Sequence, residues 1–215
     1  MNMSNSSLKL IACLTMLIDH IGAILYPDIS FLRMIGRLSF PIFAFLIVEG
    51  FHHTQNIKKY SIRLAIFALV SEVPYDLAFR GNVLDFYRQN IFFTLFLGLM
   101  CLWLYKRYKT NNQVVGLLAV CIIGIISVLL KTDYSIYGIG MIFAFDFFRD
   151  RRILACGAAS VVNFMMGSGI QGLAILAMPI IFAYNGKKGI NLKYLFYGFY
   201  PVHLIILYIL RMIWY

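Results

Sequence analysis

Charged residues are scarce in this sequence of 215 residues: 13% are Asp, Glu, Lys or Arg, while 61% are apolar. Soluble domains contain about 25% charged and about 45–50% apolar residues. A soluble fold of this size cannot bury the excess, because much of its surface stays exposed. The composition therefore excludes a water-soluble enzyme, a secreted disulfide scaffold and any sizeable extramembrane domain. It predicts a single transmembrane domain over residues 1–215.

The cysteine and glycine patterns that carry chemistry are also absent. The four cysteines, Cys13, Cys101, Cys121 and Cys156, lie singly in apolar stretches without C-x-x-C spacing. This pattern favours buried, unreactive thiols and predicts neither a metal site nor a disulfide framework. No Walker or dinucleotide glycine motif occurs, so a phosphorylated ligand would have to be held by side chains and loop amides.

Apolar stretches recur along the whole chain, and a helix needs roughly 20 such residues to cross a bilayer. The sequence predicts an all-α polytopic membrane protein with about nine transmembrane helices, at residues 8–26, 34–52, 60–79, 90–105, 113–131, 136–148, 152–166, 170–184 and 194–214. Barrel strands are not expected, because the apolar blocks do not alternate in polarity. Four of the segments (90–105, 136–148, 152–166 and 170–184) are short, so half-helices or re-entrant segments stay open for them.

The distribution of positive charge predicts the orientation of the chain. With the N-terminus in the cytoplasm, thirteen Lys and Arg residues fall on the cytoplasmic side of the nine spans and six on the other side, as the positive-inside rule requires. An odd number of spans then places the C-terminus outside. The net charge of +10 comes from clusters at span ends, which suit topology and anionic lipid headgroups. We therefore expect membrane lipids, and no nucleic acid, as partners.

Ionisable residues inside a membrane cost about 2.5 kcal/mol or more each, and so mark function. The predicted spans concentrate them in the first three helices and the last one: Asp19, His20, Arg37, Glu49, Arg63, Glu72, Asp76 and His203. With a rise of 1.5 Å per residue, His20 lies roughly 18 Å from the inner start of the first span, and His203 roughly 14 Å into the last. Both imidazoles are therefore expected at mid-depth.

Structural explanations stay open for these groups. His20 would then be a hydrogen-bonded histidine between helices, and His203 a packing residue bonded to tyrosine in an aromatic run. Asp19 points about 100° away from His20 on a helix, which favours a pair with an arginine from the second span. A salt bridge with Arg63 would explain Glu49.

Two further groups near the predicted cytoplasmic ends of spans also have simple explanations. His52 and His53 follow the second span and are interpreted as ordinary interfacial residues. The basic cluster of Lys58, Lys59 and Arg63 fits either lipid headgroups or a phosphorylated cytoplasmic ligand, which needs several cationic donors.

Four segments together resemble the TraX family of multi-pass membrane proteins: LKLIACLTMLIDHIG at 8–22, LRMIGRLSFPIFAFLIVEGF at 32–51, RLAIFALVSEVPYDLAF at 63–79 and KYLFYGFYPVHL at 193–204. The family is named for a conjugation protein that acetylates the N-terminus of a pilin subunit. The resemblance implies a bacterial inner (cytoplasmic) membrane, acetyl-coenzyme A as donor, and a distant likeness to acyltransferases with an intramembrane histidine. By the family pattern, the characteristic motifs contain Asp19, His20, Arg33, Arg37, Glu49, Asp76, Asp133 and His203.

The residues and the resemblance predict a membrane-embedded acetyltransferase. It would move an acetyl group from cytosolic acetyl-coenzyme A to an amine or hydroxyl of a membrane-associated or extracytoplasmic acceptor, such as a pilin-like peptide N-terminus. Acetyl transfer needs a base and donors for a developing oxyanion. His20 is the predicted base, because an imidazole has an ordinary pKa of about 6.5. Asp19 or Asp76 is expected to orient its ring.

The remaining residues of the predicted site take supporting roles. His203, Tyr197 and Tyr200 would stabilise charge or position the thioester. Arg33 and Arg37 would steady the acceptor or orient acidic groups, and Asp133 is expected to bind the acceptor. The phosphates of coenzyme A are expected near Lys58, Lys59 and Arg63, or near Lys187 and Lys188, and Glu49 is a further predicted coenzyme A-binding residue. No metal is expected.

Two other classes of protein fit the composition. In a permease or flippase, buried charges line a translocation path, which predicts substrate flux without covalent change and charges in both halves of the chain. In a scaffolding protein, the buried charges form salt bridges and coenzyme A does not bind. The concentration of ionisable groups in the first third favours the acetyltransferase over the permease.

Overall fold

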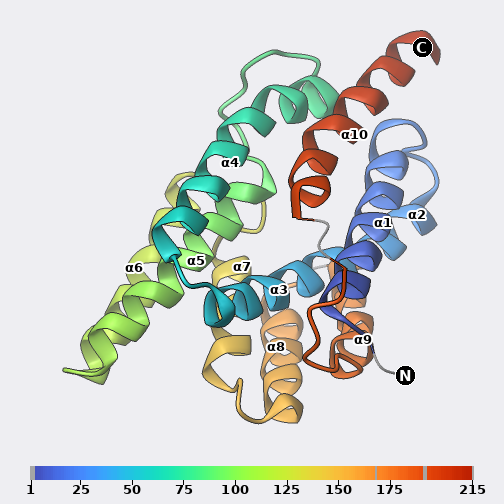
Figure 1. Ribbon diagram of the computed structural model, residues 1–215. Coiled ribbons are helices and arrows are strands. Elements are labelled where there is room, and N and C mark those ends of the chain that lie inside the picture. The colour runs from blue at the N-terminus through green and yellow to red at the C-terminus, as the bar shows by residue number, and fades with distance from the viewer. Residues whose placement is uncertain (1–2, 168, 191–192, 215) are drawn as a thin grey trace. The chain divides into compact units, whose positions relative to one another are not determined.

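The computed structural model describes residues 3–167, 169–190 and 193–214, and over these residues the fold is helical (Figure 1). No strand occurs in this part of the chain, only two isolated β-bridges, which join Met3 to Tyr184 and Gln89 to Thr132. The all-helical fold that the sequence predicts is confirmed.

The helices follow the predicted spans closely. They are α1 (Asn5–Ile24), α2 (Ser30–Gly36), α3 (Ser39–His53), α4 (Ile57–Arg80), α5 (Ile91–Lys109), α6 (Gln113–Leu129), α7 (Ser135–Phe147), α8 (Arg152–Met166), the 3-10 helix η1 (Gly169–Ala177), α9 (Met178–Phe182) and α10 (Lys193–Trp214).

Two predicted spans are each divided into two helices. The span at 34–52 consists of the end of α2 and most of α3, because Pro41 has no N–H for the carbonyl of residue 37 and so fits only the first turn of a helix. The span at 170–184 consists of η1 and α9, and Pro179 occupies the first turn of α9. Proline therefore sets both divisions.

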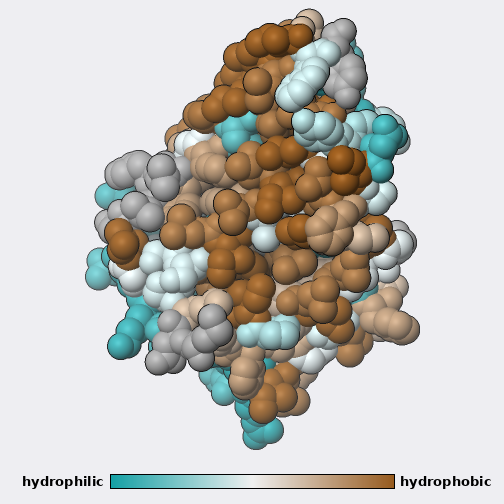
Figure 2. Space-filling view, turned by 90° about the vertical axis from the view of Figure 1, so that its right-hand side faces the viewer, coloured by the Kyte–Doolittle hydropathy of each residue, from teal (hydrophilic) through white to brown (hydrophobic). Residues whose placement is uncertain are grey.

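Within the described residues, four segments are long and apolar enough to cross a membrane: Asn5–Ile24, Ser30–His53, Ile91–Lys109 and Phe196–Trp214. Shorter apolar helices cover Gln113–Leu129, Ser135–Phe147, Arg152–Met166 and Gly169–Phe182. Large apolar side chains are exposed along several helices, among them Leu69 on α4, Ile122 on α6 and Ile206 on α10. Apolar side chains also dominate the face shown in Figure 2. These features are those of a membrane protein.

The chain divides into two compact units, each built from segments that are distant in sequence. Unit 1 consists of Met1–Phe43, Leu69–Asp85 and Gly167–Tyr215, and within it α1 packs against α2 and α10. Unit 2 consists of Ala44–Ala68 and Phe86–Met166, and within it α5 packs against α6 and α7. The core of unit 2 includes Leu97, Cys101, Ile123 and Ile139.

The cysteines are free thiols, and three of them are buried as predicted. Cys121 is an exception, because it is exposed on α6. Its neighbours Ile122 and Ile125 are exposed as well, so this apolar helix turns much of its surface outward, and burial inside the protein was the wrong prediction for Cys121.

Candidate active site

Two histidines from distant parts of the chain meet inside unit 1. A hydrogen bond of 2.7 Å joins Nδ1 of His20 on α1 to Nε2 of His203 on α10. The two ring planes differ by 8° and the ring centroids lie 5.0 Å apart. The ring centroids are much farther apart than the two bonded nitrogens, so the hydrogen bond lies in the plane of both rings. The lone pairs of imidazole nitrogens point in that plane. The rings therefore form a well-aligned pair.

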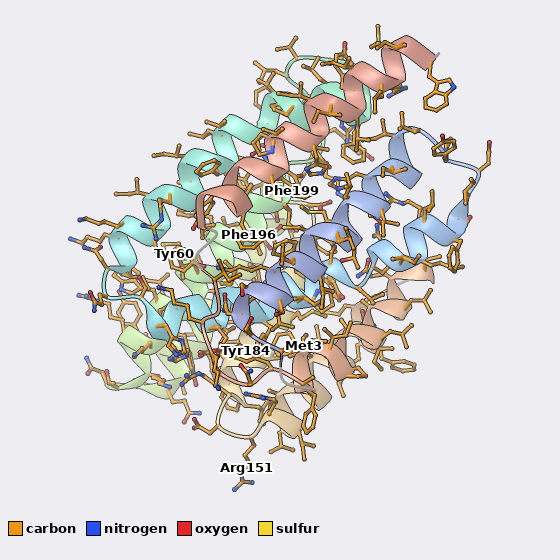
Figure 3. All side chains as sticks on the ribbon, turned by 45° about the vertical axis from the view of Figure 1, so that its right-hand side comes forward. Met3, Tyr60, Arg151, Tyr184, Phe196 and Phe199 are labelled. Atoms are coloured by element: carbon orange, nitrogen blue, oxygen red, sulfur yellow. The ribbon has the colours of Figure 1, made fainter. Side chains whose placement is uncertain are left out.

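Aromatic side chains surround the two histidines. Phe79 of α4 meets the His20 ring edge-on at 5.3 Å between centroids, and Tyr200 approaches both imidazoles, at 6.0 Å from His20 and 5.6 Å from His203. Phe199, labelled on α10 in Figure 3, stacks on His203 at 4.6 Å. Phe199 and Tyr200 reach His203 because residues three and four apart share one helix face. Both histidines are buried, so water has little access.

The carboxylate of Asp19 is held by two arginines. Nη1 of Arg33 donates to Oδ2 at 2.9 Å, and Nη2 of Arg37 donates to Oδ1. The predicted pair between Asp19 and an arginine of the second span is confirmed. Both carboxylate oxygens are thus bound by arginine, while Nδ1 of His20 is hydrogen-bonded to His203.

Arg37 connects three elements of unit 1 and has a structural role. Besides its bond to Asp19, its Nε donates to the carbonyl of Arg33 at 3.2 Å and its Nη1 donates to Oε1 of Gln171 at 3.1 Å. All three of its nitrogens therefore donate to the protein. This arrangement ties α1, α2 and η1 together through the guanidinium of Arg37. Arg33 is the more exposed of the two arginines.

A glycine permits the close approach of α2 to α1 at this ion pair. A Cβ atom added to Gly36 would lie 2.1 Å from both Cβ and Oδ1 of Asp19. Any larger residue must push the two helices apart or displace the carboxylate from its arginines. Gly36 thus fixes the geometry of the pair on the helix that carries His20.

We expect Gly36→Ala to destabilise the protein by about 1–3 kcal/mol, the usual cost of an overpacked site. The measurement is the thermal unfolding midpoint in detergent. The matched control is Gly157→Ala on α8, where an added Cβ meets nothing within 4 Å, and where alanine should stabilise the helix by up to about 1 kcal/mol. Equal midpoints for the Gly36 and Gly157 variants would show that α1 and α2 are not in close contact.

Asp76 is fully buried in unit 1, but it does not orient His20. Its Oδ2 accepts a hydrogen bond of 2.7 Å from the backbone N–H of Asp85, while its Oδ1 has no hydrogen-bond partner among the described residues. Asp76 thus holds the turn after α4. Phe79, one helix turn later on the same face, is the α4 residue that meets His20. Phe79 was not predicted as a site residue, although it follows Asp76 by three positions and so lies on the same helix face.

Glu49 and Arg63, two predicted site residues of unit 2, do not pair with each other. Carboxylate oxygens of Glu49 lie 3.9 Å from Nε of Arg149 and 3.8 Å from Nδ1 of His53. Arg63 lies over the ring of Tyr60, at 5.7 Å, and its Nε is buried with no hydrogen-bond partner in the described part of the chain. The predicted salt bridge is therefore wrong, because α7 ends beside α3 and supplies Arg149 instead.

Asp133 and His52 also have partners within unit 2. Nε of Arg88 lies 3.1 Å from Oδ1 of Asp133, an ion pair. Nε2 of His52 lies 2.5 Å from Oδ1 of Asp146. His52 is thus more than the ordinary interfacial residue that the sequence predicted. The signal for this pair was Asp146 itself, an acid near the end of an apolar helix.

The two predicted basic clusters belong to different units. Lys58 and Lys59 are exposed in the first turn of α4, next to Arg63 in unit 2. Lys187 and Lys188 lie in unit 1, where their backbone carbonyls accept hydrogen bonds of 2.8 Å and 3.3 Å from the N–H groups of Asn5 and Ser6. These two carbonyls satisfy donors of the first turn of α1, which otherwise lack partners in a helix.

Comparison with known proteins places these features in a family. A family model described as TraX protein matches residues 4–211. A probable fimbrial assembly protein FimC, serogroup H1, from Dichelobacter nodosus is 29% identical, over 93% of this chain and 92% of its own length. An uncharacterised protein from Rickettsia prowazekii is 29% identical over 48% of this chain and 38% of its own length. No solved structure matches the chain.

Proposed function

The chain belongs to the TraX family, and on this premise we propose that it is a membrane-embedded acetyltransferase. It moves an acetyl group from acetyl-coenzyme A to an amine of a membrane-associated or extracytoplasmic acceptor. The observation that carries the proposal is the buried pair of His20 and His203. The name of the Dichelobacter nodosus relative, a probable fimbrial assembly protein, supports a pilin-like peptide as the acceptor.

His20 supplies the base in this mechanism. An imidazole takes a proton from an attacking amine and later returns it to a leaving group, which contributes roughly 100- to 10,000-fold to the rate. The aromatic rings of Phe79, Phe199 and Tyr200 keep water from the pair, and a dry site protects a thioester from hydrolysis. His20 and His203 both lie on segments of the described chain that are long enough to cross a membrane, which supports an acceptor anchored in the membrane.

Lys58, Lys59 and Arg63 are proposed to hold the phosphates of the acetyl donor, which supplies an activated acetyl group. The buried Nε of Arg63, which has no partner in the described residues, fits an anionic group, because buried donors are nearly always hydrogen-bonded. The adjacent lysines add two point charges. Lys187 and Lys188 are the alternative cluster, and Glu49 has Arg149 and His53 as its neighbours.

We expect the double variant Lys58→Ala/Lys59→Ala to raise the KM for acetyl-coenzyme A about tenfold or more while kcat changes little, since each charge-assisted hydrogen bond contributes about 1.5–3 kcal/mol. Steady-state release of the coenzyme A thiol measures both constants. The charge-matched control is Lys106→Ala/Lys109→Ala at the end of α5, whose lysines have no assigned role. Equal KM values in the two double variants would show that Lys58 and Lys59 of α4 do not hold the phosphates.

The proposal also includes nine spans in the bacterial inner membrane, with the N-terminus in the cytoplasm and the C-terminus outside. Alkaline phosphatase fused to the C-terminus tests it, because that enzyme needs disulfides, which form outside the cytoplasm. We expect an active fusion. An inactive fusion in cells that hold the full-length product would mean an even number of spans or the opposite orientation.

The proposed activity is tested with the purified protein in nanodiscs. We expect release of the coenzyme A thiol from acetyl-coenzyme A to depend on a membrane-anchored peptide with a free N-terminal amine. The same peptide with a blocked amine should release none above background. Equal release of the thiol with both peptides would show that the N-terminal amine is not the acceptor, and would contradict the proposal.

A further inference from the structure

The proton positions on the histidine pair follow from a third group, the carbonyl of Phe199. Nδ1 of His203 lies 2.7 Å from this carbonyl oxygen. A carbonyl only accepts hydrogen bonds, so Nδ1 of His203 carries a proton and donates it. In an uncharged imidazole the other nitrogen, Nε2, then holds a lone pair and must accept.

The donor and the acceptor of the hydrogen bond between His203 and His20 follow from this assignment. Nε2 of His203 lies 2.7 Å from Nδ1 of His20, and since Nε2 accepts, Nδ1 of His20 is the donor. Nε2 of His20 is left with a lone pair, on the side of the ring away from His203. For an uncharged pair, this is the one proton arrangement that makes both hydrogen bonds.

We infer that His203 is a positioning residue, which holds His20 in the tautomer protonated at Nδ1 and so makes Nε2 of His20 the basic atom. That Nε2 of His20 acts as a catalytic base rests on the proposed function. The positions of the protons follow from the two hydrogen bonds alone. It separates the two histidines by role: His20 touches the reacting groups, and His203 acts through His20.

The arrangement also accounts for the charge that forms during transfer. Nε2 of His20 takes the proton that the acceptor nitrogen loses while its bond to the acetyl carbon forms. It returns that proton to the sulfur when the carbon–sulfur bond breaks, so the products are an amide and a thiol and His20 is neutral again. In between, the positive charge of His20 is shared through Nδ1–H with His203 and, beyond it, with the carbonyl of Phe199.

No carboxylate is needed for this arrangement, which agrees with the surroundings of the pair. Three aromatic side chains make ring contacts with the two imidazoles: Phe79 from α4, and Phe199 and Tyr200 from α10. Asp19, the acid next to His20 in sequence, is bound to Arg33 and Arg37. A second imidazole therefore takes the orienting place that an aspartate holds in other base-catalysed sites.

The proton arrangement is tested by nitrogen NMR of histidine-labelled protein in nanodiscs. The sequence has four histidines, so the variant His52→Gln/His53→Gln in unit 2 leaves only the pair. We expect both remaining imidazoles to be uncharged and protonated at Nδ1. A signal from an Nε2-protonated tautomer at either position would overturn the inference, whether or not the protein transfers acetyl groups.

Kinetics then tests the positioning role. His203→Gln keeps an acceptor near the position of Nε2, while His203→Leu removes it, so we expect kcat to fall at least tenfold more in the leucine variant, with similar KM values in both. Equal kcat in the two variants would show that the acceptor at this position is irrelevant to His20. An Nδ1-protonated pair in a wild-type protein without acetyl transfer would support the proton arrangement and refute only the proposed function.

Discussion

Replacement of His20 by glutamine is expected to reduce acetyl transfer roughly 100- to 10,000-fold, the usual contribution of a general base. Glutamine keeps the polar character of the side chain and its ability to hydrogen-bond His203, but it has no basic nitrogen at the position of Nε2. The loss should therefore fall on kcat, with the KM for acetyl-coenzyme A close to that of the wild type. Thiol release measured at saturating donor gives kcat directly.

The matched control for this variant is His53→Gln, the same substitution at a histidine whose side chain is 64% exposed. It should transfer acetyl groups at the wild-type rate. Unfolding midpoints of both variants show whether the protein remains folded. A folded His20→Gln protein with near-normal turnover would remove His20 from the role of base.

The second large effect is expected on stability, from Asp19→Asn. An asparagine cannot balance the charges of Arg33 and Arg37, and a partly buried ion pair that loses one partner costs about 3–5 kcal/mol. Because these side chains join α1, α2 and, through Gln171, η1, the variant should also disturb the helix that carries His20. Thermal unfolding in detergent measures the loss.

Asp28→Asn removes the same charge at an exposed position in the turn between α1 and α2, and we expect it to leave the midpoint unchanged. A triple variant, Asp19→Leu/Arg33→Met/Arg37→Met, should recover much of the stability that Asp19→Asn loses, since apolar residues of similar size often replace a buried ion pair at no cost. An Asp19→Asn protein as stable as the Asp28 control would show that the ion pair contributes nothing.

The positions of the helices could be predicted from the sequence because local features determine them. Long apolar runs defined the segments, and the ends of α5, α6, α7 and α8 lie within a few residues of their predicted bounds. The pair between Asp19 and the arginines was also predictable, because the two helices are consecutive and a buried carboxylate requires a cation. The break between α2 and α3 near Pro41 also depends on local sequence. It could have been predicted from the proline near the start of that segment.

Contacts between helices that are distant in the sequence could not be predicted. The bond between His20 and His203 joins residues 183 positions apart, and nothing in either segment specifies which helix lies opposite. The same limit explains the wrong pairing of Glu49 with Arg63, since proximity in sequence suggested α4 while the end of α7 supplies Arg149. Asp146 beside His52 and Phe79 beside His20 were missed for this reason.

The proposed function requires that this membrane protein form a covalent bond between an acetyl group and an amine. Mass spectrometry detects this bond on a pilin-like peptide that has been incubated with the purified protein and isotopically labelled acetyl-coenzyme A. We expect one labelled acetyl group on the N-terminal nitrogen with wild-type protein and almost none with His20→Gln. An unmodified peptide that has nevertheless crossed the membrane of a proteoliposome would contradict it, because flux without covalent change is the property of a permease.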